Sequence, residues 1–234
     1  MIVGEAIPAE ILTGLNHEQR THCLGLCRSA LGSEHGAAGH AANCQPLAPA
    51  AAKMDIMVSL AALPENRMLA REGRYCVYLL EGDESPLLLD ELTRRREEAF
   101  RALGEGSGQA RDTDRYDPLY SHLLLMDEEG KNIAGSYRAR VVRPEGTWQY
   151  DKKRLYTASL FEYEPEFFRQ CGNALELGRA FVCPEYQRDY TPLLLLWKGI
   201  GQMALRNGVR TLFGPASIGL NYRPQSVDLL WLHL

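Results

Sequence analysis

Two charged side chains, Glu176 and Arg179, lie inside the otherwise apolar segment Leu-Glu-Leu-Gly-Arg-Ala-Phe-Val at residues 175–182. The segment is typical of a buried strand that runs into a loop. Because isolated charges inside a strand would be costly, we expect both side chains to be paired. The pair is either a structural ion pair or part of a functional site, and the residues alone leave both interpretations open.

The backbone decides whether these two side chains can meet. Strict alternation along a strand places Glu176 and Arg179 on opposite faces of a sheet. Gly178, which lies between them, permits a β-bulge that could bring them together. A carboxylate kept dry in a cleft has a raised pKa and can accept a proton from an amine. That chemistry suits an acyl transfer in which an amine attacks a thioester.

The elements that follow this strand predict a cleft beside it. Strands are expected at 174–183 and 209–218, with a helix at 191–206 between them, which makes a parallel β-α-β unit. Such a pair tends to splay and form a ligand site. The buried face of the helix is expected to consist of Leu193, Leu196, Trp197, Ile200 and Ala204.

The start of this helix is a candidate phosphate site. The loop 184–190 leads into a helix N-terminus, whose amides attract anions. Arg188 could add a charge-assisted contact there, beside the amide of Thr191.

The rest of the chain predicts a mixed, mainly antiparallel sheet, and therefore an α+β fold. Expected strands are 1–7, 67–70, 75–80, 122–126, 133–142 and 156–163, and expected helices are 9–31, 54–63, 86–103 and 165–170. The Gly-, Ala- and Pro-rich segment 33–53 is interpreted as a linker, which gives an N-terminal segment at 1–32 and a domain at 54–234. Arg94, Arg95 and Arg96 form either a solvated helix face or a docking patch for an acidic partner.

Composition excludes several classes of protein. The 234 residues carry a formal charge of −4, whereas nucleic-acid binders usually show a basic excess. No apolar run approaches the roughly 20 residues of a transmembrane helix, and the N-terminus is unlike a secretory signal. Reduced thiols in a cytoplasmic protein are expected for the six cysteines. For Cys23 and Cys27, buried small side chains on a helix are favoured over a zinc site, and no bound metal is expected.

Several catalytic motifs are missing from the sequence. It contains no Gly-x-Ser-x-Gly, Gly-x4-Gly-Lys-Ser/Thr or His-Glu-x2-His pattern, and no Gly-x-Gly-x2-Gly pattern after a strand. These absences leave the acyl-transfer interpretation of the Glu176 strand as the leading one.

From Tyr75 to about Tyr222 the chain resembles the GNAT-fold N-acyltransferases of the ornithine-lipid synthase type, which are relatives of acyl-homoserine-lactone and N-acyl amino acid synthases. The resemblance rests on the Glu-Leu-x-Arg strand combined with an upstream Asp-x-Tyr-Asp. The matching segments are Asp114–Asp117, Gly135–Arg138, Leu175–Val182, Pro184–Gln187, Leu194–Ile200 and Leu212–Ile218.

The resemblance implies a GNAT-like sheet with a parallel β-α-β splay and a charged cluster at the acceptor end of the cleft. That cluster would consist of Asp114, Asp117 and Arg138, which bind the acceptor, and Glu176 and Arg179, which act in catalysis. The acyl donor implied is acyl carrier protein. Its phosphopantetheine would lie at Arg188 and Thr191, because residues 187–192 lack the glycines of the loop with which relatives bind coenzyme A.

The implied reaction moves a (3-hydroxy)fatty acyl group to the α-amine of an amino acid such as ornithine, in aminolipid biosynthesis. Residues 1–30 resemble the tail of a lysophospholipid acyltransferase domain, and the family's fold is expected to continue beyond residue 234. A location in the cytoplasm or at the inner membrane, with peripheral membrane contact, is expected. The alternative is a non-catalytic module that binds acyl carrier protein or a membrane partner.

Overall fold

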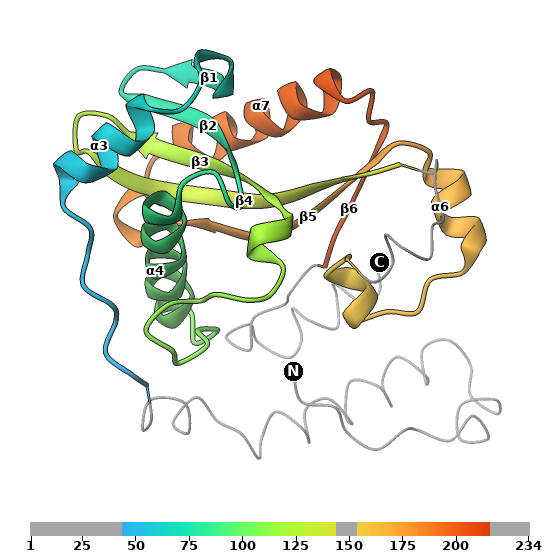
Figure 1. Ribbon diagram of the computed structural model, residues 1–234, viewed down its shortest axis with the longest axis horizontal. Coiled ribbons are helices and arrows are strands. Elements are labelled where there is room, and N and C mark those ends of the chain that lie inside the picture. The colour runs from blue at the N-terminus through green and yellow to red at the C-terminus, as the bar shows by residue number, and fades with distance from the viewer. Residues whose placement is uncertain (1–43, 144–153, 216–234) are drawn as a thin grey trace. The chain divides into compact units, whose positions relative to one another are not determined.

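The computed structural model describes residues 44–143 and 154–215. The expectations for the strand at 1–7, the helix at 9–31 and the side chains of Cys23 and Cys27 therefore lie outside the described residues. Residues 45–215 form one compact unit. Its six strands and the helices around them confirm the α+β class (Figure 1).

The sheet follows the order of the chain. Strands β1 to β5 pair with their neighbours antiparallel, and β5 pairs with β6 parallel, as expected for a mixed sheet with one β-α-β unit. The parallel ladder within the described residues covers only 174–176 of β5, although β5 continues for six more residues. The strands are β1 Met68–Glu72, β2 Tyr75–Glu81, β3 Ser121–Asp127, β4 Asn132–Val142, β5 Ala174–Val182 and β6 Thr211–Phe213.

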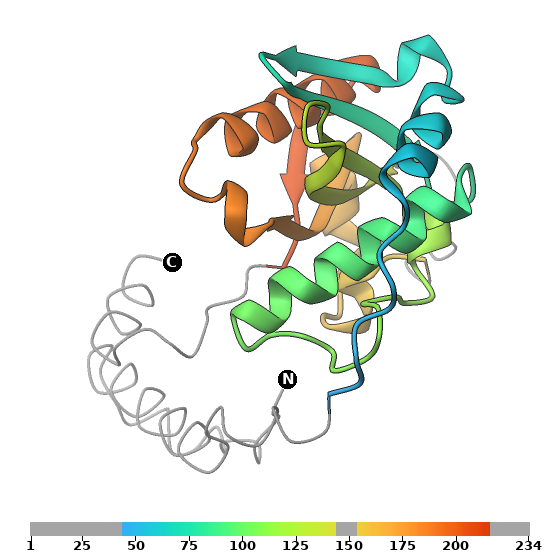
Figure 2. The same ribbon diagram turned by 90° about the vertical axis from the view of Figure 1, so that its left-hand side faces the viewer.

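Two long helices cover opposite faces of this sheet. Helix α7 (Thr191–Arg206) packs on the face that carries Val77 and Leu123. Helix α4 (Pro86–Ala102) packs on the other face, against β4 and β5, and α3 (Lys53–Ala61) lies beside it (Figure 2). Ser85 caps α4 through a hydrogen bond from the amide of Leu88, as Ser-Pro at a helix start predicts.

Shorter helices complete the described part of the chain. The expected helix near 165–170 is α6, Pro165–Cys171. Single 3-10 turns are η2 Glu65–Arg67, η3 Asp117–Leu119, η4 Thr157–Ser159 and η5 Pro184–Tyr186.

The expected strand at 156–163 is wrong. Within it lies the 3-10 turn η4, and no ladder includes these residues. The amide of Tyr156 donates to the Tyr120 hydroxyl, and the amide of Thr157 donates to Glu176. These backbone N–H groups are therefore hydrogen-bonded to side chains and are not available for pairing with a neighbouring strand.

The buried face of α7 is rotated about the helix axis relative to the face expected from the sequence. Leu196 and Ile200 are buried, but Leu193 and Trp197 are about half exposed. The rest of the buried face is Pro192, Leu195, Gly199 and Met203. Gly199 determines this rotation, because a glycine lets the helix backbone approach the sheet closely.

The compact unit begins earlier than the composition suggests. The amides of Gln45 and Ala48 donate to the carbonyls of Gly108 and Ala110. The amide of Ala51 donates to the Glu91 carboxylate. The end of the segment interpreted as a linker is therefore attached to α4 and to the loop after it.

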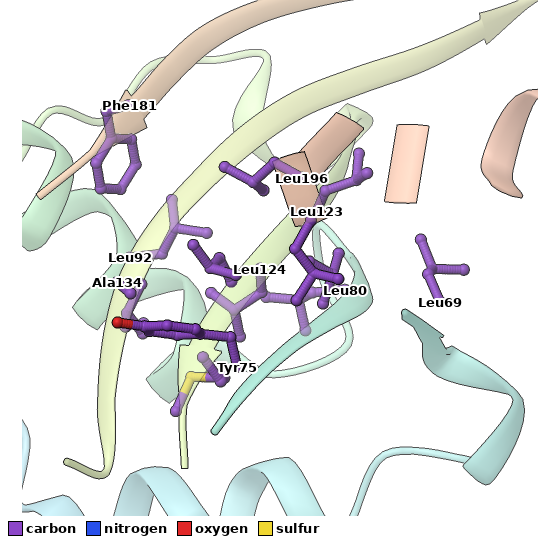
Figure 3. Packing of buried hydrophobic residues seen from close by; sticks show 14 of the residues in the cluster. Leu69, Tyr75, Leu80, Leu92, Leu123, Leu124, Ala134, Phe181 and Leu196 are labelled. Atoms are coloured by element: carbon purple, nitrogen blue, oxygen red, sulfur yellow. The ribbon is translucent and has the colours of Figure 1, made fainter. Parts of the chain in front are cut away.

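One hydrophobic core fills the space between the sheet and its helices (Figure 3). Leu124 lies on the α4 side with Leu92, whereas Leu123 lies on the α7 side with Leu196. A second, smaller cluster of Val142, Leu155, Phe168 and Ala174 packs α6 against the end of the sheet.

Two glycines of α7 give a matched test of this packing. A Cβ at residue 199 would lie 2.8 Å from Val77 Cγ1 and 3.1 Å from Leu123 Cδ2, whereas a Cβ at residue 201 meets nothing within 4 Å. Gly199→Ala should lower the free energy of unfolding by about 1–3 kcal/mol through overpacking. Gly201→Ala should raise it by roughly 0.5–1 kcal/mol through helix propensity. Urea unfolding measures both, and equal effects would contradict the packing.

Candidate functional site

Strand β5 contains a bulge beside the expected site. Arg138 pairs with Gly178 and Ser136 with Phe181, so Arg179 and Ala180 together lie opposite the single residue Tyr137. The bulge that Gly178 suggested is confirmed. However, the left-handed residue is Arg179, with φ +48°, which is an uncommon conformation for a side chain of this size.

This bulge brings Arg179 to the α4 side of the sheet. There, three arginines and three aspartates form a closed ring in which each guanidinium contacts two carboxylates. Arg96 contacts Asp112 (2.8 Å) and Asp117 (2.9 Å), Arg138 contacts Asp117 (3.0 Å) and Asp114 (2.7 Å), and Arg179 contacts Asp114 (3.5 Å) and Asp112 (3.2 Å). The ring joins α4, the loop after it, β4 and β5.

The ring is buried on one side and open on the other. Arg96 and Arg138 are each 1% exposed and Asp117 is 2% exposed. The side chains of Asp114 and Arg179 are 21% and 26% exposed. Burial opposes ionisation of Asp117, but Arg96 and Arg138 outweigh it and hold the pKa of that carboxyl below its ordinary value.

Polar atoms without a hydrogen bond gather at this site. Among the described residues, Asp114 Oδ2, Arg138 Nη2 and Arg179 Nε are buried atoms that form none. Asp114 Oδ2 lies 3.5 Å from Arg179 Nη2, which is an ion-pair contact without hydrogen-bond geometry. The partly exposed side chains of Asp114 and Arg179 thus border buried polar atoms without hydrogen bonds, which indicates this side of the ring as a candidate ligand site.

Three tyrosine rings surround the guanidinium of Arg138. Its Cζ lies 5.8 Å from the ring centroid of Tyr116, 5.0 Å from that of Tyr120 and 5.1 Å from that of Tyr156. The guanidinium of Arg179 also lies over Tyr156, at 5.6 Å. These aromatic walls keep water from the buried cations and stabilise them through their π faces.

Glu176 lies next to the ring but does not pair with Arg179. One of its oxygens accepts from the Tyr120 hydroxyl, and the other accepts from the Thr157 amide at 2.7 Å. The carboxylate is 1% exposed. The expected ion pair is therefore replaced by two neutral donors, although Glu176 is dry as predicted. Burial, and then the charge of Glu176, raise the pKa of Tyr120, so its hydroxyl stays a donor.

Both interpretations of the three consecutive arginines on α4 are wrong. Arg96 lies in the buried ring, and Arg95 donates to the Ile133 carbonyl and contacts Glu98 and Glu185. Arg94 pairs with Glu91 and Glu98. Neither a solvated face nor a docking patch remains, because these side chains bind groups of the protein itself.

The candidate phosphate site is partly occupied by the protein's own groups. Arg188 is exposed at the loop before α7. The amide of Thr191 already donates to the Asp189 carboxylate at 2.8 Å, and Pro192 brings no N–H. The helix start thus has fewer free donors than the sequence suggests, and phosphopantetheine binding there stays a prediction.

Sequence reasoning missed several residues of this site, namely Arg96, Asp112, Tyr120, Tyr156 and Thr157. A signal existed for Arg96, which follows Leu92 by four residues and precedes Ala99 by three, on the buried stripe of α4. No sequence signal connects Tyr120 to Glu176, because 56 residues separate them.

Residues 95–197 match the family model described as an acetyltransferase (GNAT) domain. These residues are similar to the GNAT domain family. The matched range runs from α4 into α7 and contains every member of the Arg–Asp ring together with Glu176.

Curated proteins similar to this chain are N-acyltransferases by name. Glycine N(alpha)-acyltransferase of Phocaeicola vulgatus is 32% identical over 66% of this chain and 51% of its own length. L-ornithine N(alpha)-acyltransferase of Rhodobacter capsulatus is 29% identical over 79% of this chain and 65% of its own length. The enzyme of the same name from Rhizobium meliloti is 34% identical over 55% of this chain and 44% of its own length. The chain therefore spans about half the length of the first of these relatives.

Among the residues that the structure describes, no helix combines the length and apolar character needed to cross a membrane.

The Arg–Asp ring predicts a large asymmetry between arginine substitutions. Arg96→Met removes one of the two guanidinium partners of both Asp112 and Asp117 in a buried site and should lower the free energy of unfolding by about 3–5 kcal/mol. Arg169→Met removes only an exposed pair with Glu166 and should change it by less than about 1 kcal/mol. Chemical unfolding of both variants checks this, and similar losses would contradict the role of the ring.

His122 predicts how stability depends on pH. It is buried behind the ring, with Nε2 3.0 Å from the Asp117 carbonyl and with Arg96 and Arg138 nearby. Burial lowers the pKa of His122 from 6.5 to about 4. The unfolded chain thus binds the proton more tightly, so stability is complete above pH 6.5 and is lost as the pH falls toward about 4.

Over this window the wild-type chain should lose about 3 kcal/mol of unfolding free energy. His122→Gln, which keeps a donor for the Asp117 carbonyl but does not titrate, should show a flatter profile. Denaturant unfolding at a series of pH values measures the difference. Parallel profiles for the two proteins would contradict the assignment.

Proposed function

We propose that the chain is an N-acyltransferase that moves a (3-hydroxy)fatty acyl group from acyl carrier protein to the α-amine of an amino acid such as ornithine, in aminolipid biosynthesis. The observation that carries the proposal is the open edge of the Arg–Asp ring inside a GNAT domain. Relatives named for glycine and L-ornithine acylation support it.

The open edge suits the part that all α-amino acids share. The side chains of Asp114 and Arg179 are 21% and 26% exposed, and each has one buried polar atom without a hydrogen-bond partner among the described residues. An α-ammonium group would bind Asp114, and an α-carboxylate would bind Arg179. Asp117 and Arg138 hold Asp114 in place from the buried side, and Asp112 holds Arg179. Such recognition is independent of the amino-acid side chain, and the names of the relatives likewise include both glycine and ornithine.

The chemistry requires the amine in its neutral form. Glu176, dry and adjacent to the ring, assists removal of one ammonium proton. The amine nitrogen then attacks the thioester carbonyl, and the C–N bond forms as the C–S bond breaks. The second proton leaves the nitrogen and ends on the departing phosphopantetheine thiolate.

The acyl donor is placed where β5 ends and α7 begins. Arg188 and the start of α7 near Thr191 receive phosphopantetheine of acyl carrier protein, and the acyl chain lies beyond the short parallel ladder of β5 and β6. The protein acts in the cytoplasm, in peripheral contact with the inner membrane that receives the acylated product.

Acylation assays test this function. The full chain is incubated with an acyl carrier protein thioester and single amino acids, and acyl amino acids are detected by mass spectrometry. Glu176→Gln should lower kcat by a factor of about 10²–10⁴. Glu166→Gln, on the exposed surface of α6, is the matched control and should leave kcat unchanged.

Thermal unfolding of both variants separates a catalytic defect from loss of the fold. If no amino acid is acylated while a full-length relative is active in parallel, the proposed function is wrong. Full activity of Glu176→Gln would remove Glu176 from the mechanism.

A further inference from the structure

Helix α7 is apolar on two opposite faces. One face is buried against the sheet and includes Leu196 and Ile200. The other carries a second stripe of apolar side chains at exposed positions, four of them in the first two turns and one two turns after Trp197, with Gly201 between. The stripe, called the outer stripe below, consists of Tyr190, Leu193, Leu194, Trp197 and Leu205.

The outer stripe is strongly exposed within the described part of the chain. Tyr190 is 83%, Leu205 77% and Leu194 60% exposed. Trp197 is also open to solvent along one side, while its ring lies 6.0 Å from that of Tyr137. Single exposed leucines are ordinary on a protein surface, but several exposed apolar side chains on the helix face opposite the core indicate an interaction surface.

The charges around the stripe indicate what it contacts. Helix α7 contains no acidic residue, although the whole chain is acidic, with a formal charge of −4. Between residues 188 and 210 there are four basic residues and a single acidic one, Asp189, and one of the four, Lys198, pairs with Glu72 of β1. Arg188, Arg206 and Arg210 are exposed at the two ends of the helix.

We propose that the outer stripe is the surface with which this protein lies on an anionic lipid membrane. A helix of 16 residues, about 24 Å long, would rest in the interface with its leucines among the acyl chains. Trp197 and Tyr190 suit the headgroup level, because each has an apolar ring and one polar atom. The basic residues at both ends attract anionic headgroups.

The proposed function includes peripheral contact with a membrane, and the outer stripe is the part of the protein that would make this contact. The inference therefore rests on the proposed function. The outer stripe also suits the product, since an acylated amino acid is amphiphilic and leaves an aqueous site most easily into a lipid layer.

Vesicle binding by the full chain tests the surface. Sedimentation is measured with vesicles of an equimolar mixture of phosphatidylglycerol and phosphatidylcholine, and with vesicles of phosphatidylcholine alone, without acyl donor or amino acid. We expect binding to the anionic vesicles that weakens with salt. The triple variant Tyr190→Ser, Leu194→Ser and Leu205→Ser should bind them at least about tenfold more weakly.

A matched triple variant controls for the loss of exposed apolar side chains as such. Met54→Ser, Val58→Ser and Leu103→Ser change residues that are 50–64% exposed on α3 and at the end of α4. This variant should bind vesicles like the wild-type chain. Equal losses in the two triple variants would overturn the proposal.

A fluorescence measurement keeps the proposal testable even if the first triple variant does not fold. In the otherwise unchanged chain, brominated phosphatidylcholine should quench emission on binding, and Trp197→Phe should remove that part of the signal. Failure of the wild-type chain to bind either kind of vesicle would overturn the proposal, as would binding without quenching of Trp197.

Two further outcomes distinguish the membrane surface from a protein-docking surface and from the proposed acyltransferase function. If the outer stripe substitutions abolish binding of acyl carrier protein but not of vesicles, the stripe is a protein-docking surface and the proposal is wrong. Because vesicle binding needs no turnover, a chain that binds vesicles but acylates nothing would contradict the proposed function and leave the membrane surface intact.

Discussion

The ring of three arginines and three aspartates is the constraint on which the rest of the site depends. Its members come from α4, the loop after it, β4 and β5, so none of these elements can move without separating a buried charge from its partners. Two of the arginines are almost completely buried, and a lone guanidinium there would be very costly. Each carboxylate instead lies between two guanidinium groups, so the cluster is neutral as a whole.

A ring of this kind is weak evidence for stability and better evidence for specificity. Well-packed apolar side chains could fill the same volume at no loss of stability. What the ions add is a fixed geometry with an open edge at Asp114 and Arg179, where unsatisfied atoms of opposite character lie next to each other. A zwitterionic ligand needs such a preorganised pair, since the site then reorganises little on binding.

The bulge in β5 and the close contact of α7 with the sheet are the two backbone features that place everything else. Side chains along a strand alternate between the two faces of the sheet. The left-handed conformation of Arg179 interrupts this alternation at the bulge, and Arg179 therefore reaches the ring. On the opposite face, Gly199 brings α7 close to Val77 and Leu123 and thereby turns Leu193, Leu194 and Trp197 outward. The same short contact that packs the core thus produces the apolar outer stripe of the helix.

The sequence by itself determined the order and type of nearly all the described elements, the mixed sheet and the parallel last pair. Hydrophobic periodicity, Ser-Pro at a helix start and the glycine in β5 are local signals. The resemblance to a known family indicated Glu176, Arg179, Asp114, Asp117 and Arg138 as one neighbourhood. Only the tertiary structure decided how these residues pair. Glu176 is bound by Tyr120 and Thr157 in place of Arg179, and Arg96 lies in the ring in place of solvent. The reason is physical: which partner a buried charge finds depends on contacts across 16 to 56 residues of chain, whereas patterns in a sequence report only neighbours along one element.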